Sequence, residues 1–327
     1  MTVNGDGTRP VVGVIGTGSM GGTVAGRVLR AGYRLHVHDI RPGATRELVS
    51  AGAMPAPDPQ ALAAACDIVL LSLPSHVEVE QVCLGGRGVL TSLRPGGGLV
   101  NLTTGSVRQL PALAGAAQAR GVHLVTAPVS QGVDGAERGA LSAFTAGTDE
   151  GLALALPVLR TFCLTVIRLG SPEAAMAAKI ITNLWWFINA AALGPLTVLA
   201  VRAGIPPGQV QEVLTASCGS SWVAEHDLQS VLGDSPRGRY DQTFTLGLAD
   251  KDLGLAAELA GLVNVPLGLV GEAAQEVFRQ ALKACGPDAP ELSPVLLAEQ
   301  LTGTQLSPAT SACCPPAGSA GGGGPAV

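Results

Sequence analysis

Short apolar runs alternate with amphipathic segments along the first half of the chain. The apolar runs have the length of buried strands, and the segments between them carry apolar residues at helical spacing. Strands are expected over residues 10–15, 33–38, 67–73, 98–101, 122–126, 141–146 and 164–169. Helices are expected over 22–31, 58–66, 75–84, 107–120 and 149–160. This alternation predicts an α/β fold, with a doubly wound sheet covered by helices on both faces.

A long helix is expected next, from residue 172 to residue 202. Alanine, leucine and isoleucine dominate it, and no charged residue occurs between Ile180 and Val201. At 1.5 Å per residue it would be on the order of 45 Å long, enough to run from one domain into another. A membrane span is the alternative, since the uncharged part is long enough. Interspersed Thr and Asn residues, and the absence of flanking basic clusters, favour a buried helix instead.

A glycine-rich turn separates the first expected strand from the first helix. It reads Gly16-Thr-Gly18-Ser19-Met20-Gly21, and Asp39 closes the second strand 23 residues after Gly16. In a Rossmann unit the first glycine permits the tight turn, the second admits a pyrophosphate, and the third allows close helix–strand packing. The helix N-terminus then faces the anion. Strand, turn, helix, strand and acid in this order predict dinucleotide binding.

The end of the second strand bears on the choice of cofactor. Asp39 can accept hydrogen bonds from the ribose hydroxyls and repels a 2′-phosphate, which favours NAD. Arg41 favours NADP, because a guanidinium there could bind that phosphate. Since Asp39 stands at the strand end itself, NAD is expected and NADP is the alternative. Leu73 and Pro74, where the third strand ends, are expected to contribute to the same cofactor site.

The second half of the chain is helical in pattern. Helices are expected over 206–216, 244–262, 267–284 and 291–301, and irregular structure over 127–136 and 217–239. Residues 302–327 are rich in Gly, Pro, Ser and Ala and predict a disordered tail. The predicted organisation is a disordered lead (1–9), a Rossmann domain (10–171), an interdomain helix with an all-α domain (172–301), and the tail.

Composition excludes several classes of function. The formal net charge is −5, from 20 basic and 25 acidic residues, which attracts neither nucleic acid nor an acidic membrane. The N-terminal stretch has no apolar signal region. The seven cysteines form no C-x-x-C pair and most lie in apolar surroundings, so most are expected to be buried reduced thiols of a cytoplasmic protein. The five histidines show no ligand spacing, and no metal site is predicted.

Four motifs, in order between about residues 11 and 285, resemble the β-hydroxyacid dehydrogenase family, which includes 3-hydroxyisobutyrate dehydrogenase. They are the glycine-rich turn with its Met20, the loop from Ala127 through Gly132 to Leu141, Lys179-x-x-x-Asn183, and Lys251-Asp-Leu with Leu255-Ala. Four motifs in one order are far more specific than any of them alone.

The resemblance implies catalytic roles for two residues of the long helix. Lys179 would be the general base in alcohol oxidation and the general acid in carbonyl reduction. Asn183 would hold the substrate and orient the lysine. The residues themselves agree with this, because a spacing of four places both on one helix face. A lysine beside apolar surface also loses hydration, which lowers its pKa. Read alone, Lys179 could instead simply reach water from the end of a buried helix.

The resemblance also implies a substrate loop at residues 130–132. Ser130 and the backbone around Gly132 would bind the substrate carboxylate. Gln131 stands where the family usually has Gly, and it would add an amide beside the substrate or turn outward. Thr126 is a further departure, since the family usually has Asp before the Ala-Pro pair.

Two further residues are assigned to the cofactor side by the resemblance. Thr103 lies where the family contacts cofactor and substrate, although Asn101 and Thr103 replace the usual Asp and Ser. Lys251 would lie near the nicotinamide. Its alternative is structural, as a helix cation paired with Asp250 or Asp252.

Together these observations predict an NAD(P)-dependent oxidoreductase acting on a small carboxylate-bearing 3-hydroxyacid, 3-hydroxyisobutyrate-like, with Lys179 as acid/base. The alternatives are a semialdehyde, carbonyl or imine reductase on the same fold, or a non-catalytic dinucleotide-binding module. Imine reductases generally lack a lysine at this position. A charge-free helix of this length also predicts a homodimer or homotetramer.

Overall fold

The computed structural model describes residues 9–232 and 244–306. The chain divides into two compact units, the first ending at Ile181 and the second beginning at Thr182. This division falls inside the long helix α9 (Pro172–Arg202). The disorder predicted for the two ends concerns residues 1–8 and 307–327, which lie outside the described residues.

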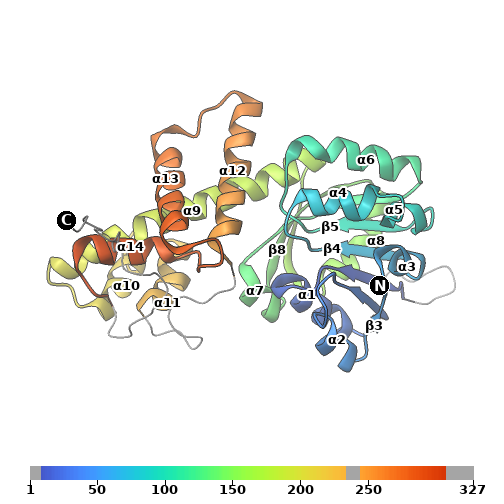
Figure 1. Cartoon of the computed structure of the whole chain (residues 1–327), viewed down its shortest axis with the longest axis horizontal. Helices are drawn as coiled ribbons and strands as arrows, with labels where there is room; N and C mark the ends of the chain where they lie inside the picture. Colours follow the sequence, from blue (N-terminus) through green and yellow to red (C-terminus); the bar gives the residue numbers. More distant parts are fainter. Residues whose placement is uncertain (1–8, 233–243, 307–327) are drawn as a thin grey trace, which may run out of the picture. The chain divides into compact units, whose positions relative to one another are not determined.

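The first unit is built on one sheet covered by helices (Figure 1). The strand order is β3-β2-β1-β4-β5-β6-β8-β7, with β9 paired to β8. The strands from β3 to β6 run parallel, whereas β8 is antiparallel to β6 and β7. The bounds are β1 Val12–Ile15, β2 Leu35–His38, β3 Met54–Pro55, β4 Ile68–Leu71, β5 Gly98–Asn101, β6 His123–Thr126, β7 Val129–Ser130, β8 Leu141–Gly147 and β9 Cys163–Arg168. The predicted doubly wound α/β fold is confirmed.

Each face of the sheet carries its own apolar core. Val14 of β1 belongs to the core shared with α1 and α8, and its neighbour Ile15 belongs to the core shared with α3 to α6. The central strands are apolar on both faces because helices cover both. The helices are α1 Ser19–Arg30, α2 Arg46–Ser50, α3 Pro59–Ala64, α4 His76–Leu84, α5 Val89–Ser92, α6 Leu110–Ala119, α7 Gly132–Arg138 and α8 Asp149–Leu159, with a 3-10 turn at Val107–Gln109.

Two segments expected to be irregular contain regular structure. Residues 127–136 form β7 and most of α7, because Gly135 leaves room for the Gln131 side chain, which would lie 2.5 Å from a Cβ there. Within 217–239 a π-helical turn (Val223–Asp227) leads into α11 (Leu228–Leu232), and Val223, Leu228 and Val231 are buried. Glycine and polar residues obscured both helices in the sequence pattern, and residues 233–239 lie outside the described part of the chain.

The second unit is entirely helical in its described residues. Besides the greater part of α9 and α11 it contains α10 Pro207–Thr215, α12 Leu246–Val263, α13 Gly268–Cys285 and α14 Ser293–Thr302. Phe187 and Phe278 meet edge to face at 5.1 Å in its core. Trp186 packs on this core and its Nε1–H donates to Asp227 at 2.9 Å. Trp185 instead is exposed, as expected for neighbours on a helix, which point in different directions.

Among the described helices, α9 has the length and hydropathy of a membrane span. One side of it is packed, however: Phe187, Ala190 and Leu193 lie in the second unit's core. Three of the cysteines are buried free thiols, and burial raises the pKa of Cys83 to about 12. Cys218 is an exposed free thiol and Cys285 is disulfide-bonded, so the expectation of buried reduced thiols holds for three of the five cysteines within the described residues.

Candidate active site

The glycine-rich turn has the geometry that the sequence predicts. Gly16 has a φ of +86°, and a Cβ there would lie 2.1 Å from the Ser72 backbone oxygen. A Cβ on Gly21 would lie 1.9 Å from the Gly16 oxygen, so α1 packs against the turn only without side chains. At Gly18, the N-cap of α1, a Cβ would approach only Arg41, at 3.5 Å. The turn is therefore closed toward the protein and accessible toward a ligand.

Asp39 is bound by its own chain on both carboxylate oxygens. Oδ2 accepts from the Thr17 backbone N–H at 2.8 Å and from Arg41 Nη2 at 3.0 Å. Oδ1 accepts from the Arg41 backbone N–H at 2.8 Å and from Arg41 Nε at 3.0 Å. Burial opposes ionisation of Asp39, but these hydrogen bonds and the charge of Arg41 outweigh it and hold the pKa of the carboxyl well below its usual value. The group that faces solvent here is the guanidinium, since Arg41 is exposed and Asp39 is not.

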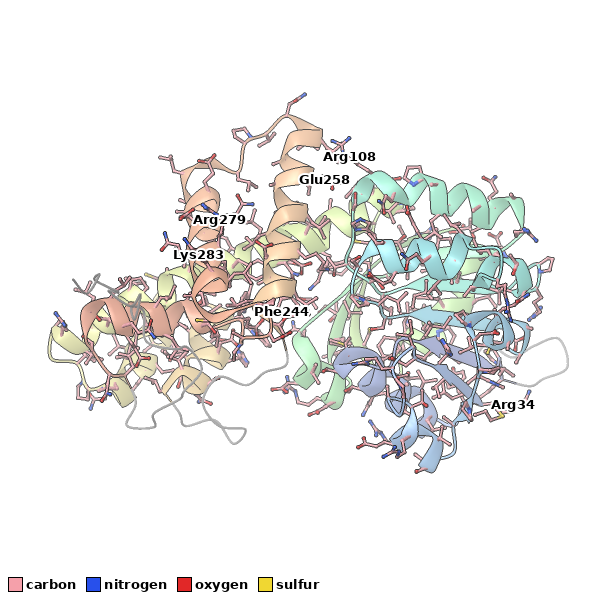
Figure 2. All side chains as sticks on the ribbon, in the orientation of Figure 1. Arg34, Arg108, Phe244, Glu258, Arg279 and Lys283 are labelled. Atoms are coloured by element: carbon pink, nitrogen blue, oxygen red, sulfur yellow. The ribbon has the colours of Figure 1, made fainter. Side chains whose placement is uncertain are left out.

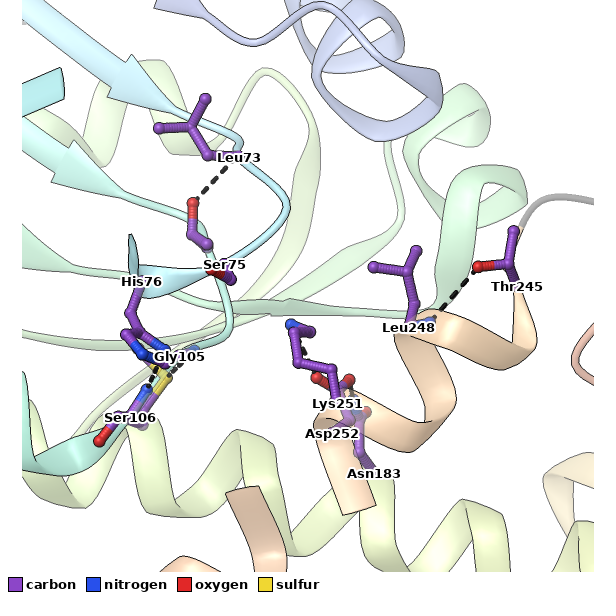
Figure 3. A network of polar contacts seen from close by, with 12 residues as sticks. Leu73, Ser75, His76, Gly105, Ser106, Asn183, Thr245, Leu248, Lys251 and Asp252 are labelled. Carbon is purple, nitrogen blue, oxygen red and sulfur yellow. Dashed lines mark hydrogen bonds and ion pairs between the residues drawn. The ribbon is translucent and has the colours of Figure 1, made fainter. Parts of the chain in front are cut away.

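The loops after β4 and β5 are tied to each other. The Leu73 backbone N–H donates to Thr103 Oγ at 3.0 Å, and the Thr103 backbone N–H donates to Asn101 Oδ1 at 3.0 Å. The first of these contacts is drawn in Figure 3. Because its hydroxyl oxygen accepts from Leu73, the Thr103 O–H is left to donate. Asn101 thus has a local structural role as an acceptor, which the aspartate usual in the family could fill equally.

The same loop contacts the beginning of α9. The Gly105 N–H lies 3.4 Å from the sulfur of Met176, and the Ser106 N–H lies 3.2 Å from His76 Nδ1 (Figure 3). Met176 precedes Lys179 by three residues. The first turns of α9 are therefore fixed to the carboxyl end of the parallel strands, the edge at which ligands bind in open α/β sheets.

The predicted substrate loop contains a strained residue. Gln131 has a φ of +94° and a ψ of +12°, a left-handed conformation that only one other non-glycine residue, Asn264, adopts in the described part of the chain. Gly132 follows with a φ of +62°, and α7 begins there. A glutamine in place of the expected glycine therefore costs about 1 kcal/mol of backbone strain. Strain retained beside a candidate binding loop points to a function for the side chain.

The two predicted catalytic residues lie in one continuous helix. Lys179 and Asn183 are four residues apart in α9 and share a face. Asn183 Nδ2 donates to Asp252 Oδ2 at 2.6 Å, and Lys251 Nζ forms an ion pair with Asp252 Oδ1 at 2.9 Å (Figure 3). Asp252 is buried and its side chain is only 3% exposed. The structural alternative for Lys251, a pair with Asp252, is thus present, and its predicted place near the nicotinamide stays a prediction.

Asp252 is the residue that the sequence analysis did not assign to the site. An ionised carboxylate only accepts hydrogen bonds, so it binds the NH₂ group of Asn183 and fixes which way the amide faces. The Asn183 carbonyl oxygen is then directed away from Asp252 as an acceptor. The sequence feature that could have indicated Asp252 as a site residue is its place beside Lys251 in a mostly apolar helix. An adjacent Lys-Asp pair is equally compatible with two exposed surface residues.

Comparison with known proteins identifies the family of the chain. Residues 11–170 match the NAD binding domain of 6-phosphogluconate dehydrogenase, and residues 174–296 match the NAD-binding domain of NADP-dependent 3-hydroxyisobutyrate dehydrogenase. The chain is 33% identical over 299 residues to 2-(hydroxymethyl)glutarate dehydrogenase of Eubacterium barkeri, which covers 90% of this chain and 97% of that protein. The chain belongs to the β-hydroxyacid dehydrogenase family.

Two further relatives support the same family. The 3-hydroxyisobutyrate dehydrogenase of Pseudomonas aeruginosa is 33% identical over 275 residues, covering 83% of this chain and 92% of that protein. A crystal structure of 3-hydroxyisobutyrate dehydrogenase from Salmonella typhimurium superimposes with a TM-score of 0.79 at 29% identity, covering 88% of this chain and 99% of that one. This β-hydroxyacid dehydrogenase is therefore an NAD(P)-dependent enzyme, and both its predicted fold and its predicted cofactor class are confirmed.

The residues of this β-hydroxyacid dehydrogenase fit a nicotinamide dinucleotide. Gly16 and Gly21 form a turn that any Cβ would fill, and the α1 N-terminus follows at once, as pyrophosphate binding requires. Asp39 and Arg41 stand at the strand end where the adenine ribose belongs. Within the described residues no group of three His, Cys, Asp or Glu side chains converges as metal ligands would.

Proposed function

We propose that this enzyme interconverts a small 3-hydroxyacid and the corresponding carbonyl compound, with Lys179 moving the proton. The observation that carries the proposal is the α9 face with Lys179 and Asn183, the latter held in one orientation by Asp252. Among relatives, the named substrates are hydroxyacids, which agrees with this chemistry.

The chain's own residues would act on the substrate as follows. A bound nicotinamide supplies the hydride chemistry at the carbinol carbon. Lys179 removes the hydroxyl proton during oxidation and returns a proton to the carbonyl oxygen during reduction. The Asn183 carbonyl oxygen accepts a hydrogen bond from the substrate hydroxyl or from the lysine, which aligns the two groups.

Recognition of the carboxylate is assigned to the loop after β6. Ser130 offers a hydroxyl, and Gln131 and Gly132, which both have positive φ angles, would offer backbone N–H groups as further donors. Such donors bind a carboxylate without a charged side chain. A carboxylate one carbon beyond the carbinol would reach this loop while the hydroxyl faces Lys179, which is why a 3-hydroxyacid is proposed.

The free carboxylate should be required for turnover. Each charge-assisted hydrogen bond contributes about 1.5–3 kcal/mol, so losing two should lower kcat/KM by about 100-fold or more. The measurement compares 3-hydroxyisobutyrate, and then other small 3-hydroxyacids, with their methyl esters by nicotinamide absorbance. Equal kcat/KM for an acid and its ester would contradict the carboxylate assignment.

The Gln131→Gly variant on the same panel reports on the Gln131 amide. We expect this amide to favour substrates with a second polar group over those with a methyl group.

NAD should be preferred over NADP, and Asp39→Asn should reverse or reduce that preference. An ionised carboxylate repels a 2′-phosphate, and neutralising it also releases Arg41 to bind the phosphate. The ratio of kcat/KM for NAD to that for NADP should fall on the order of 10–100-fold, as expected for one charge contact at a partly exposed site. Arg41→Ala is the matched control: it should lower NADP use and leave NAD use nearly unchanged. A wild-type enzyme that works better with NADP would refute the assignment.

We also propose that the enzyme is a homodimer or homotetramer, supported by the exposed apolar residues of α9.

The cytoplasmic location expected from the sequence stays a prediction, which fractionation of the source cells would test.

A further inference from the structure

The strand order locates the loops that the nicotinamide half of the cofactor would reach. β1 lies between β2 and β4, and β5 lies beyond β4. Asp39 follows β2, where the adenine ribose belongs, and the glycine-rich turn follows β1, where the pyrophosphate belongs. Neighbouring strands are about 4.8 Å apart, so the rest of a dinucleotide extends over the segments after β4 and β5. The segment after β5 is called the β5 loop and comprises residues 102–106.

His76, the first residue of α4, joins that helix to the β5 loop. The Ser106 backbone N–H donates to His76 Nδ1 at 3.2 Å (Figure 3). A backbone N–H can only donate, so Nδ1 must be the nitrogen of the ring that carries no proton. The imidazole therefore serves the loop as an acceptor.

Gly105 brings the same loop against the backbone of α4. A Cβ on Gly105 would lie 2.7 Å from the Cβ of His76 and 3.4 Å from its Cα. Gly105 does not have a positive φ, so the close approach, and not a left-handed backbone, requires glycine here. The Gly105 N–H also lies 3.4 Å from the sulfur of Met176 in α9.

The β5 loop is held by separate contacts and not by continuous packing. A cavity of about 20 Å³ lies against it, lined among others by His76, Thr103 and Met176. Because interiors are otherwise close-packed, a loop beside a cavity depends on its few contacts for its position. After the loop, Arg108 is exposed at the surface (Figure 2), and its backbone N–H donates to Ser106 Oγ at 3.1 Å.

We propose that His76 is a positioning residue of the hydride-transfer site, which acts by holding the β5 loop and, with it, Thr103. The Thr103 side chain accepts from the Leu73 N–H at 3.0 Å, so this residue links the two segments that the nicotinamide half would reach. A displacement of such a loop by about 1 Å can cost as much as 100-fold in rate. The assignment rests on the function proposed above, because it presupposes hydride transfer to or from a nicotinamide.

The first test compares His76→Leu with His76→Asn by steady-state turnover of 3-hydroxyisobutyrate with NAD. Leucine offers no acceptor, so kcat should fall about 10–100-fold. The Oδ1 of asparagine is bonded to Cγ as Nδ1 is in histidine, so kcat should return to within about threefold of wild type. The Kd for NADH, measured by fluorescence titration, should change far less than kcat, since His76 lies outside the glycine-rich turn.

His123→Asn is the matched control for these two variants. His123 Nδ1 also lies 3.2 Å from a polar partner, the Thr148 hydroxyl, but His123 begins β6 at the opposite edge of the sheet. Its replacement should leave kcat unchanged. Circular dichroism confirms that each variant folds.

A second test approaches the same contact from the loop. Gly105→Ala should press the loop away from α4 and lower kcat in the same range as His76→Leu. Gly115→Ala on α6 is the matched control, because a Cβ there meets no atom within 4 Å. The double variant of His76→Leu and Gly105→Ala should be no slower than the slower single variant, since both remove one contact.

The outcomes separate the role of His76 from the proposed function. A wild-type enzyme that binds NADH but turns over no hydroxyacid overturns both. A wild-type enzyme with turnover, together with unchanged kcat in His76→Leu, overturns only the role of His76. An asparagine variant as slow as the leucine variant also overturns it, because the acceptor would then not be what the site requires.

Discussion

Replacing Lys179 with alanine should reduce kcat by about 10²–10⁴-fold, the usual contribution of a general acid–base group. The residue lies on α9 one turn before Asn183, and Met176 in the preceding turn contacts the loop after β5. Lys179 lies outside the glycine-rich turn, so cofactor binding should be retained. The measurement is steady-state turnover with NAD and 3-hydroxyisobutyrate, together with the Kd for NADH by fluorescence titration.

Two further variants separate proton transfer from charge. Lys179→Arg keeps the positive charge, but a guanidinium cannot be deprotonated in this pH range, so turnover should stay low. Lys283→Ala removes a lysine from the last turn of α13 and should leave kcat unchanged. Near-normal turnover of the alanine variant would refute the role of Lys179 even if the substrate class were correct.

The fold was predictable because the apolar runs of its strands and the helical spacing of apolar residues in its helices are strong, local patterns. The buried strands β1, β4 and β5 are continuous apolar runs, and α1 begins directly after the glycine-rich turn. The failures occurred where structure depends on tertiary contacts. The helix α7 contains two glycines, Gly132 and Gly135, and its formation depends on how Gln131 fits over Gly135. Propensity alone argues against a helix there.

The site was predictable only as far as neighbours in sequence are neighbours in space. The turn, Asp39 and the Lys179–Asn183 pair follow from spacing within one element or one βαβ unit. The contact of Asn183 with Asp252 joins residues 69 positions apart, and no pattern in the sequence shows it. Similarly, the sequence places Arg41 near Asp39 but does not show that the guanidinium occupies both carboxylate oxygens. The substrate itself depends on side chains from several loops, which is why its class is a proposal.

Asp252 has a positioning role, because its partners Asn183 and Lys251 both present N–H groups to its carboxylate. Its carboxylate accepts a hydrogen bond from Asn183 on Oδ2 and forms an ion pair with Lys251 through Oδ1. Asparagine at this position would have nearly the same shape but could donate as well as accept, so the Asn183 amide would no longer be fixed in one orientation. Lys251 would also lose its ion pair with Asp252, although a lysine side chain that is 23% exposed is partly solvated.

Asp252→Asn should therefore lower kcat by about 10–100-fold, as small misplacements of catalytic groups do. The KM for cofactor should change little, because Asp252 lies outside the glycine-rich turn that is predicted to bind the pyrophosphate. The melting temperature should fall by about 2–4 °C for each kcal/mol lost. Asp250→Asn is the matched control: it removes the same charge two residues earlier on α12, where the side chain is exposed, and should leave kcat intact. A loss of stability in Asp252→Asn with unchanged kcat would mean that the carboxylate only holds the helices together, and that the orientation of Asn183 is set by other contacts.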